Sequence, residues 1–376
     1  MGELWDQSQK ESVHRLMWEP QPILPPWKGV VDNVPSIVAP TSSFASATGF
    51  WIDKQRLKSI PQQANLAGWS TGYRPLIGAR SFVDAVGDIH TVLFSADQAQ
   101  YYVNGVFTSI IGANPSLVPI TAEVYQNVLF FTNGNTYIAA IDGSANALTD
   151  PLLNNGTSYF LGKLAGRLLA LNLVEPIPGQ AGSTAYPRRV RWSAENNGFD
   201  WSSYDAGVFD ISEIEDNITG YATQGALGYV YHSQGISVMT PTGGISPTFF
   251  VENYSEGDEG IGPGNYYPYS LAQYGNMTCF AAIDDIYMFN PLVGPLQPIG
   301  GTASRSIYID LFNSTSYAIG AMVPSFGSGI SNLQYWLAIP FSNNTSRIWM
   351  YSFDSQTWMA QMVPFNVTCM SNIAID

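Results

Sequence analysis

The sequence predicts an all-β fold, a β-propeller of six or seven blades that is closed by strands from both termini and preceded by an extended N-terminal arm. Three observations predict it: short β-type runs between turn residues, a weak internal repeat, and few charged residues. The repeat averages about 48 residues, a length typical of a four-stranded propeller blade. Only 12% of the 376 residues are charged. Because surface helices carry many charged residues, this composition disfavours a mainly helical protein.

Residues 1–40 are expected to form the arm, and residues 41–376 the propeller. Ser8 to Glu11 fits a helix capping box, but Pro20 and Pro22 end any helix there. Further prolines make the following stretch extended and stiff. Three tryptophans lie along the arm, and they either fold back on the propeller or dock on a partner: Trp5, Trp18 and Trp27.

The repeat is marked by similar segments at the start of each unit. These segments occupy residues 78–82, 119–122, 159–162, 218–221, 269–272, 318–321 and 365–368. The last unit is too short for a blade, so strands from residues 43–60 are expected to complete it and close the ring. A pair of packed β-sheets is the competing architecture, but it does not explain the repeat length.

The two cysteines fall at matching places in two units, because Asn276 to Cys279 is echoed by Asn366 to Cys369. Two cysteines are too few for a disulfide framework or a zinc cluster. Both are interpreted as small residues of buried strands.

Nothing in the sequence predicts catalysis or a cofactor. His14, His90 and His232 lie in different units and lack metal-ligand spacing, which disfavours a histidine metal site or a Ser-His-Asp triad. Two acidic clusters are interpreted as solvated loops, although a carboxylate pair would suit a glycan hydrolase and oxygen ligands would suit calcium. Their members are Asp210, Glu213, Glu215 and Asp216, and Glu252, Glu256, Asp258 and Glu259.

The net charge of −14 is unevenly distributed. Residues 1–80 carry a net charge of +2, residues 81–304 carry −15, and the remaining residues carry −1. A polyanionic body of this kind excludes tight binding of nucleic acid through a general basic surface.

The few basic residues form two groups. Lys54, Arg56 and Lys58 alternate, which places them on one face of a strand, either to protect an edge or to contact an acidic neighbour such as another copy of the chain. Arg188, Arg189 and Arg191 precede Trp192, and both residue types anchor protein interfaces. Interface and structural roles both remain open for this second group.

The most distinctive stretch runs from Arg188 to Trp201, with R-V-R-W-S followed by D-W, and then I-T-G at Ile218 to Gly220. This order resembles the β-propeller tail proteins of short-tailed bacteriophages, a family of tail hub, nozzle and packaged-DNA stabilisation proteins. The segment from Asn33 to Leu57 is also similar to the opening segment of that family. The specific resemblance covers roughly 60 residues.

The resemblance implies a virion structural protein without catalytic activity, made in the host cytoplasm and located in the phage tail. Its partners would be further copies of itself in a ring, often a hexamer, together with portal, adaptor and other tail proteins. Such a ring closes the tail channel and retains packaged DNA until ejection. The two acidic clusters would face that channel, where they repel the DNA backbone and let it pass without tight binding.

The main alternative is a carbohydrate- or receptor-binding propeller that uses aromatic residues such as Tyr266 to Tyr269, and a glycan hydrolase is a further one. No secretory signal is expected from the first residues. No membrane span is expected either, because Lys163 and Arg167 interrupt the most apolar stretch, residues 159–174.

Overall fold

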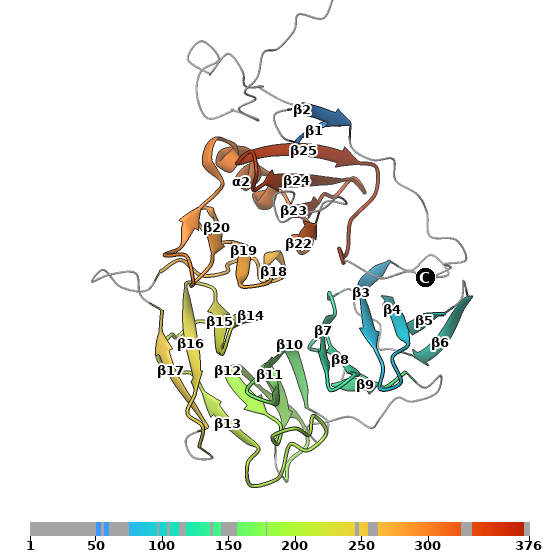
Figure 1. Cartoon of the computed structure of the whole chain (residues 1–376), viewed down its shortest axis with the longest axis vertical. Helices are drawn as coiled ribbons and strands as arrows, with labels where there is room; N and C mark the ends of the chain where they lie inside the picture. The colour runs from blue at the N-terminus through green and yellow to red at the C-terminus, as the bar shows by residue number, and fades with distance from the viewer. Residues whose placement is uncertain are drawn as a thin grey trace, which may run out of the picture.

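The computed structural model forms a disc of six β-sheets around a central opening (Figure 1). It describes residues 50–53, 56–59, 75–95, 98–103, 106–112, 118–135, 138–143, 156–177, 179–244, 248–254, 262–324 and 333–371. In each sheet the strands are antiparallel and follow chain order, and the first strand lies nearest the opening. The predicted β-propeller is confirmed, and it has six blades.

Five blades have four strands, and blade 2 has three within the described residues. Blade 1 contains β3 (Leu76–Val83), β4 (Ile89–Ser95), β5 (Gln98–Val103) and β6 (Val106–Gly112). Blade 2 contains β7 (Thr121–Tyr125), β8 (Val128–Thr132) and β9 (Ala139–Ile141). Blade 3 contains β10 (Thr157–Leu164), β11 (Arg167–Pro176), β12 (Ser183–Trp192) and β13 (Gly207–Asp210).

The remaining blades follow the same order. Blade 4 contains β14 (Ile218–Gln224), β15 (Leu227–His232), β16 (Gly235–Pro241) and β17 (Phe249–Asn253). Blade 5 contains β18 (Ala272–Tyr274), β19 (Met277–Ala281), β20 (Ile286–Phe289) and β21 (Gln297–Pro298), preceded by the short helix η1 (Pro268–Ser270). Blade 6 contains β22 (Ile319–Pro324), β23 (Leu333–Pro340), β24 (Ser346–Ser352) and β25 (Thr357–Val363).

Tight turns join the first two strands of several blades. Gln126 and Asn127 both have positive φ angles, 51° and 63°, and so do Ala165 and Gly166, at 47° and 68°. Two-residue loops with this geometry match the right-handed twist of antiparallel strands. They keep the inner strands close enough together to surround the opening.

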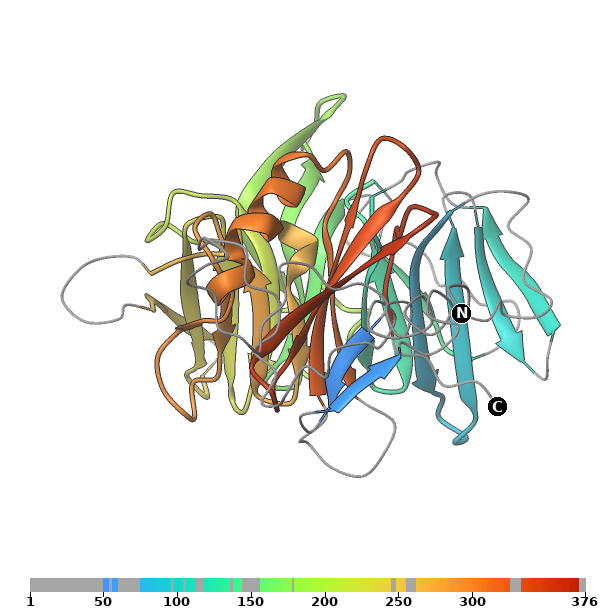
Figure 2. The ribbon, with the colours of Figure 1, turned by 90° about the horizontal axis from the view of Figure 1, so that it is seen from above.

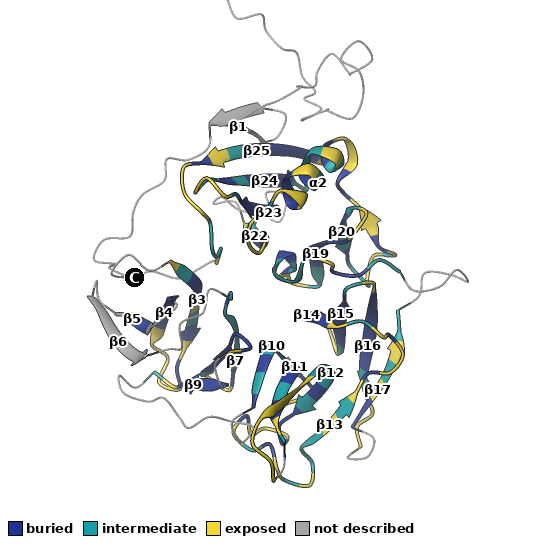
Figure 3. Cartoon of the chain, turned by 180° about the vertical axis from the view of Figure 1, so that it is seen from behind, coloured by how far each residue is buried: buried dark blue, intermediate teal, exposed yellow. Residues whose placement is uncertain are grey.

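The hydrophobic core lies between neighbouring blades, and buried residues follow the strands in Figure 3. Trp192 on β12 is an example, because its ring lies 5.3 Å from that of Phe249 in blade 4, at an interplanar angle of 89°. Its indole nitrogen also donates to the carbonyl of Asp205 at 3.2 Å. A Cβ atom at Gly207 would lie 2.3 Å from the Trp192 ring, so only glycine lets β13 approach this closely.

One α-helix, α2 (Ser304–Phe312), lies in the connection between blades 5 and 6, directly after η2 (Gly301–Ala303). Figure 2 shows this helix from its side. Asp310 of this helix is 5% exposed and accepts hydrogen bonds from Arg347 Nη1 at 2.8 and 2.9 Å and from Trp349 Nε1 at 2.7 Å. These contacts attach the helix to β24 of blade 6.

The propeller does not close through the expected blade made of strands from both ends of the chain. All four strands of blade 6 come from residues 319–363, so the expectation that residues 43–60 complete a blade was wrong. Within the described residues, β1 (Phe50–Asp53) and β2 (Arg56–Ser59) form a hairpin of their own, which lies against β25 (Figure 1, Figure 2). No strand is missing from blade 6, and therefore none had to be supplied by the other end of the chain.

The segment after β25 joins the two ends of the ring without forming a strand. The Thr368 hydroxyl donates to the carbonyl of Leu76, the first residue of β3. Val367 and Met370 pack against the apolar face of blade 6. Cys279 lies on β19, whereas Cys369 lies in this irregular segment, so the predicted equivalence of the two cysteines was wrong.

Candidate functional site

The central opening holds a cavity of about 260 Å³. The first strands of all six blades, or the residues next to them, contribute to its wall, together with Cys369, Met370 and Ser371. The cavity is thus formed only when the ring of blades is closed. Its other lining residues are Ile77, Gly78, Ala79, Arg80, Phe94, Pro119, Ile120, Thr121, Ala122, Phe160, Leu161, Gly220, Tyr221, Pro268, Tyr269, Leu271, Gln273, Ile319 and Gly320.

Hydrogen bonds between neighbouring blades connect the inner strands at one end. Lys163 Nζ donates to the Val124 carbonyl at 3.1 Å, and the Thr223 hydroxyl donates to the Lys163 carbonyl at 2.6 Å. The Gln273 side-chain amide donates in turn to the Thr223 carbonyl. Carbonyls on the exposed edge of an inner strand would otherwise lack partners from their own sheet. These side chains satisfy them and hold the blades in place around the cavity.

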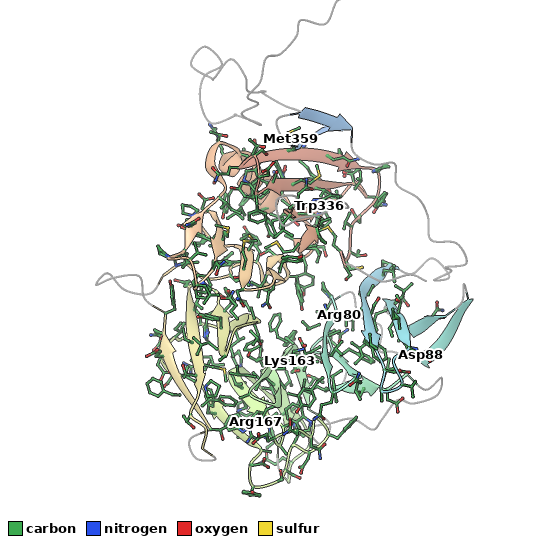
Figure 4. All side chains as sticks on the ribbon, in the orientation of Figure 1. Arg80, Asp88, Lys163, Arg167, Trp336 and Met359 are labelled. Carbon is green, nitrogen blue, oxygen red and sulfur yellow. The ribbon has the colours of Figure 1, made fainter. Side chains whose placement is uncertain are left out.

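Polar and apolar groups line the cavity in similar measure, and one formal charge lies among its described lining residues. Arg80 on β3 is the only charged residue among the described lining residues. It is exposed and lies at the edge of the opening in Figure 4. Burial raises the pKa of Tyr221 and Tyr269 above the ordinary tyrosine range, so both phenols stay neutral. Such a wall suits a small apolar ligand with a single anionic group.

The Arg188–Trp192 group is built into blade 3. Arg189 pairs with Glu175 at 2.7 Å and with Asp210 at 2.8 Å. Arg191 Nε lies 3.0 Å from a Glu175 carboxylate oxygen, in an ion pair that is not aligned as a hydrogen bond. These two arginines therefore stabilise the strand pairs of the blade.

Trp192 itself is only 8% exposed and belongs to the core between blades 3 and 4. Of the two roles left open for Trp192, its burial supports the structural one, and an interface role for it stays a prediction. The indole of Trp192 fills the space between two packed sheets. The position of Trp192 after three arginines in the sequence did not indicate this role. Arg188 is half-buried, and an interface role for it stays a prediction.

The described acidic residues lie away from the propeller's central cavity. Asp210 and Glu252 are on the outermost strands of blades 3 and 4, and Glu213, Glu215 and Asp216 are in the connection between those blades. Hydrogen bonds from Arg189 lower the pKa of Asp210. The hypothesis that this group lines a channel between subunits stays a prediction. Three further members lie outside the described residues: Glu256, Asp258 and Glu259.

The other predicted interface residues are only partly placed. Arg56 and Lys58 share one face of β2, but Lys54 precedes that strand and lies outside the described residues. The expectation that all three cations lie on one face of a strand therefore stays a prediction. The arm, residues 1–40, also lies outside the described residues, and with it the tryptophans Trp5, Trp18 and Trp27.

The two described histidines have structural partners. His232 is fully buried, with Nδ1 at 3.1 Å from the Asp216 carbonyl and Nε2 at 3.1 Å from the Ser237 hydroxyl. Burial lowers the pKa of His232 to about 4. His90 Nε2 lies 2.9 Å from Asp84 Oδ2. The described residues contain no group of three or more His, Cys, Asp or Glu side chains placed to hold a metal ion.

Sequence reasoning missed Arg80 as a site residue. The segment Gly78 to Phe82 was recognised only as the start of a repeat unit. Its position on the innermost strand of a blade was the available signal, because that strand borders the central opening.

The fold defines this chain as a six-bladed β-propeller. No family model and no curated protein matches the sequence. Among solved structures, the extracellular domain of BT4673 from B. thetaiotaomicron is similar at 9% identity and a TM-score of 0.46, over 78% of this chain and 35% of that one. The present chain thus spans about a third of the length of that domain.

Two further solved structures are similar. BamB from Moraxella catarrhalis matches at 11% identity and a TM-score of 0.37, over 74% of this chain and 81% of that one. The Pan2 WD40 domain from Neurospora crassa matches at 9% identity and a TM-score of 0.43, over 78% and 80% of the two chains. These similarities concern the fold and do not bear on function.

Within the described segments, no helix has the length and apolar character needed to cross a membrane. The stretch of residues 159–174, interrupted by Lys163 and Arg167, forms parts of β10 and β11 in blade 3.

Proposed function

We propose that this protein is a non-catalytic structural subunit of a short-tailed phage tail, in which several copies form a ring that extends and closes the channel. The observation that carries the proposal is the sequence order from Arg188 to Trp201, which resembles that family. This segment spans the end of β12 and the turns that follow, and it places Trp192 and Trp201 in the core. The shared residues are thus ones that a common blade structure would require.

The charge distribution supports the proposed role. Four of the five cations in residues 81–304 pair with carboxylates of the same chain: Lys163, Arg167, Arg189 and Arg191. This region holds 20 acidic residues against 5 basic ones, and of those that the structure describes, Glu213, Glu215 and Glu252 are exposed. An acidic surface facing a channel repels DNA and lets it move without sticking.

The test is assembly together with DNA passage. Purified protein, alone and mixed with portal and adaptor proteins of a short-tailed phage, is examined by electron microscopy. Closed rings, often of six copies, support the proposal. In a reconstituted tail, a variant with Glu213→Lys, Glu215→Lys and Glu252→Lys is expected to retain DNA more strongly than the native protein. Monomers in every mixture would refute the ring.

A second candidate is a carbohydrate-binding propeller, and an aromatic cluster favours it. Tyr266 is 45% exposed and Tyr317 is 41% exposed. The ring of Tyr317 lies 4.8 Å from that of Tyr269, and the rings of Tyr266 and Tyr267 are 5.3 Å apart. Exposed aromatic faces of this kind stack against sugar rings. Glycan binding by a monomer, lost in Tyr266→Ala and Tyr317→Ala variants, would favour this candidate over the tail subunit.

A further inference from the structure

We propose that the cavity at the centre of the propeller binds a small amphipathic carboxylate, whose anionic group pairs with Arg80 while its apolar body is enclosed by aromatic and aliphatic side chains. Binding of a small molecule in this cavity goes beyond the proposed role in the tail. Its evidence comes from the chemistry of the cavity wall and from the environment of the arginine.

Arg80 differs from most other cations of the described chain. Five of them lie within 3.5 Å of a carboxylate: Lys163, Arg167, Arg189, Arg191 and Arg347. Among the described residues Arg80 has no such partner, although acidic residues outnumber basic ones almost two to one. Arg188 and Arg305 also have no carboxylate partner among the described residues, but they do not line the cavity. Arg80 is thus a cation available to a ligand inside the disc.

The guanidinium group selects the class of anion. Its planar array of N–H donors matches a carboxylate in a bidentate arrangement. A carboxylate partly withdrawn from water between the blades gains more from this pairing than it would in open water. An amine at the same place would face the positive charge of Arg80, so the site discriminates by charge.

The size of the cavity limits the apolar part of the ligand. A cavity of about 150 Å³ holds benzene. The space of about 260 Å³ therefore accommodates one aromatic ring and a short chain that carries the carboxylate. The side chains of Ile120, Phe160, Tyr221, Tyr269 and Leu271 border this space and supply apolar contacts.

Neutral polar groups add hydrogen-bonding capacity without adding charge. Burial raises the pKa of the Tyr269 phenol, so its hydroxyl keeps its proton. Thr121, Gln273 and Ser371 also line the cavity. Among the lining residues that the structure describes there is no carboxylate side chain to compete with the ligand for Arg80.

The test is isothermal titration calorimetry with matched probes. Phenylacetate, phenylacetamide and phenethylamine share one ring but differ in charge, and hexanoate and indole acetate extend the set of carboxylates. The native protein is expected to bind at least one of the carboxylates, and phenylacetate at least tenfold more tightly than phenylacetamide, because a hydrogen-bonded charge pair is replaced by a neutral contact. Phenethylamine is expected to bind most weakly.

Two variants test the assignment of Arg80. Arg80→Gln is expected to abolish the preference for phenylacetate over phenylacetamide, whereas Arg80→Lys retains part of it. Arg305→Gln makes the same charge change on α2, away from the cavity, and is expected to leave the preference intact. Circular dichroism and the unfolding midpoint establish that each variant is folded.

The proposal is overturned if none of the carboxylates binds the native protein, if the three matched probes bind equally, or if folded Arg80→Gln keeps the native preference. Ring assembly is measured on the same samples. Failure of carboxylate binding with intact rings refutes only the cavity site, whereas carboxylate binding by monomers refutes only the tail proposal.

Discussion

The buried His232 predicts a specific loss of stability in mild acid. Its imidazole is fully buried and is held between the Asp216 carbonyl and the Ser237 hydroxyl. Burial lowers its pKa from 6.5 to about 4. Between these two values the unfolded chain binds a proton that the folded protein does not bind. Stability therefore falls as the pH falls from 6.5, and the loss is complete below about pH 4.

The size of the effect follows from the two pKa values. The full difference corresponds to about 3 kcal/mol, at 1.36 kcal/mol for each pH unit. Lowering the pH from about 8 to about 5 realises about 2 kcal/mol of it. No reduction for solvent screening applies, because the side chain is not exposed.

The assay compares the native protein with His232→Gln, whose amide is uncharged at both pH values. The free energy of unfolding is measured with urea and tryptophan fluorescence, at constant ionic strength. Carboxylates titrate in both proteins, so the difference between their pH-dependent losses isolates His232. The native protein is expected to lose about 2 kcal/mol more than the variant. Equal losses, or a His232 ring that titrates near pH 6.5 in NMR spectra of the folded protein, would refute the reasoning.

Three further substitutions test the packing of the propeller. Thr368→Val removes the hydrogen bond to the Leu76 carbonyl and is expected to lower the free energy of unfolding by about 1–2 kcal/mol, while Thr368→Ser has little effect. Equal free energies of unfolding for the two variants would contradict a role of this hydrogen bond in closing the propeller. Gly162→Ala places a Cβ atom 2.1 Å from the Tyr221 ring and is expected to cost roughly 1–3 kcal/mol in urea unfolding, and an unchanged midpoint would show that the ring moves freely. Asp310→Ala leaves a buried indole and a partly buried arginine without their acceptor and is expected to cost about 3 kcal/mol by the same assay, whereas a loss near zero would contradict the attachment of α2.

The sequence was sufficient to predict the propeller because its repeat and turn residues are local signals. The segments at 78–82, 119–122, 159–162 and 218–221 do lie within or overlap the inner strands of four blades. The closure of the ring was not predictable in the same way. A strand pattern does not specify which edge a strand pairs with, and β1 and β2 pair with each other.

The site was harder to predict because side-chain roles depend on distant partners. Arg189 was recognised as unusual, but Glu175 and Asp210, which neutralise it, lie on the adjacent strands β11 and β13. Arg80 appeared ordinary in the sequence, since only the closed ring of blades places it at a cavity whose described lining holds no carboxylate. Charge counting therefore located the acidic region but not the single cation at the centre.

The most direct test of the proposed tail function is the mass of the native assembly. Native mass spectrometry of the purified protein, with electron microscopy of the same sample, is expected to show a closed ring whose mass is a whole multiple of 41.0 kDa, most simply six copies. A protein that stays at 41.0 kDa at all concentrations, and also in the presence of portal and adaptor proteins, would contradict the account.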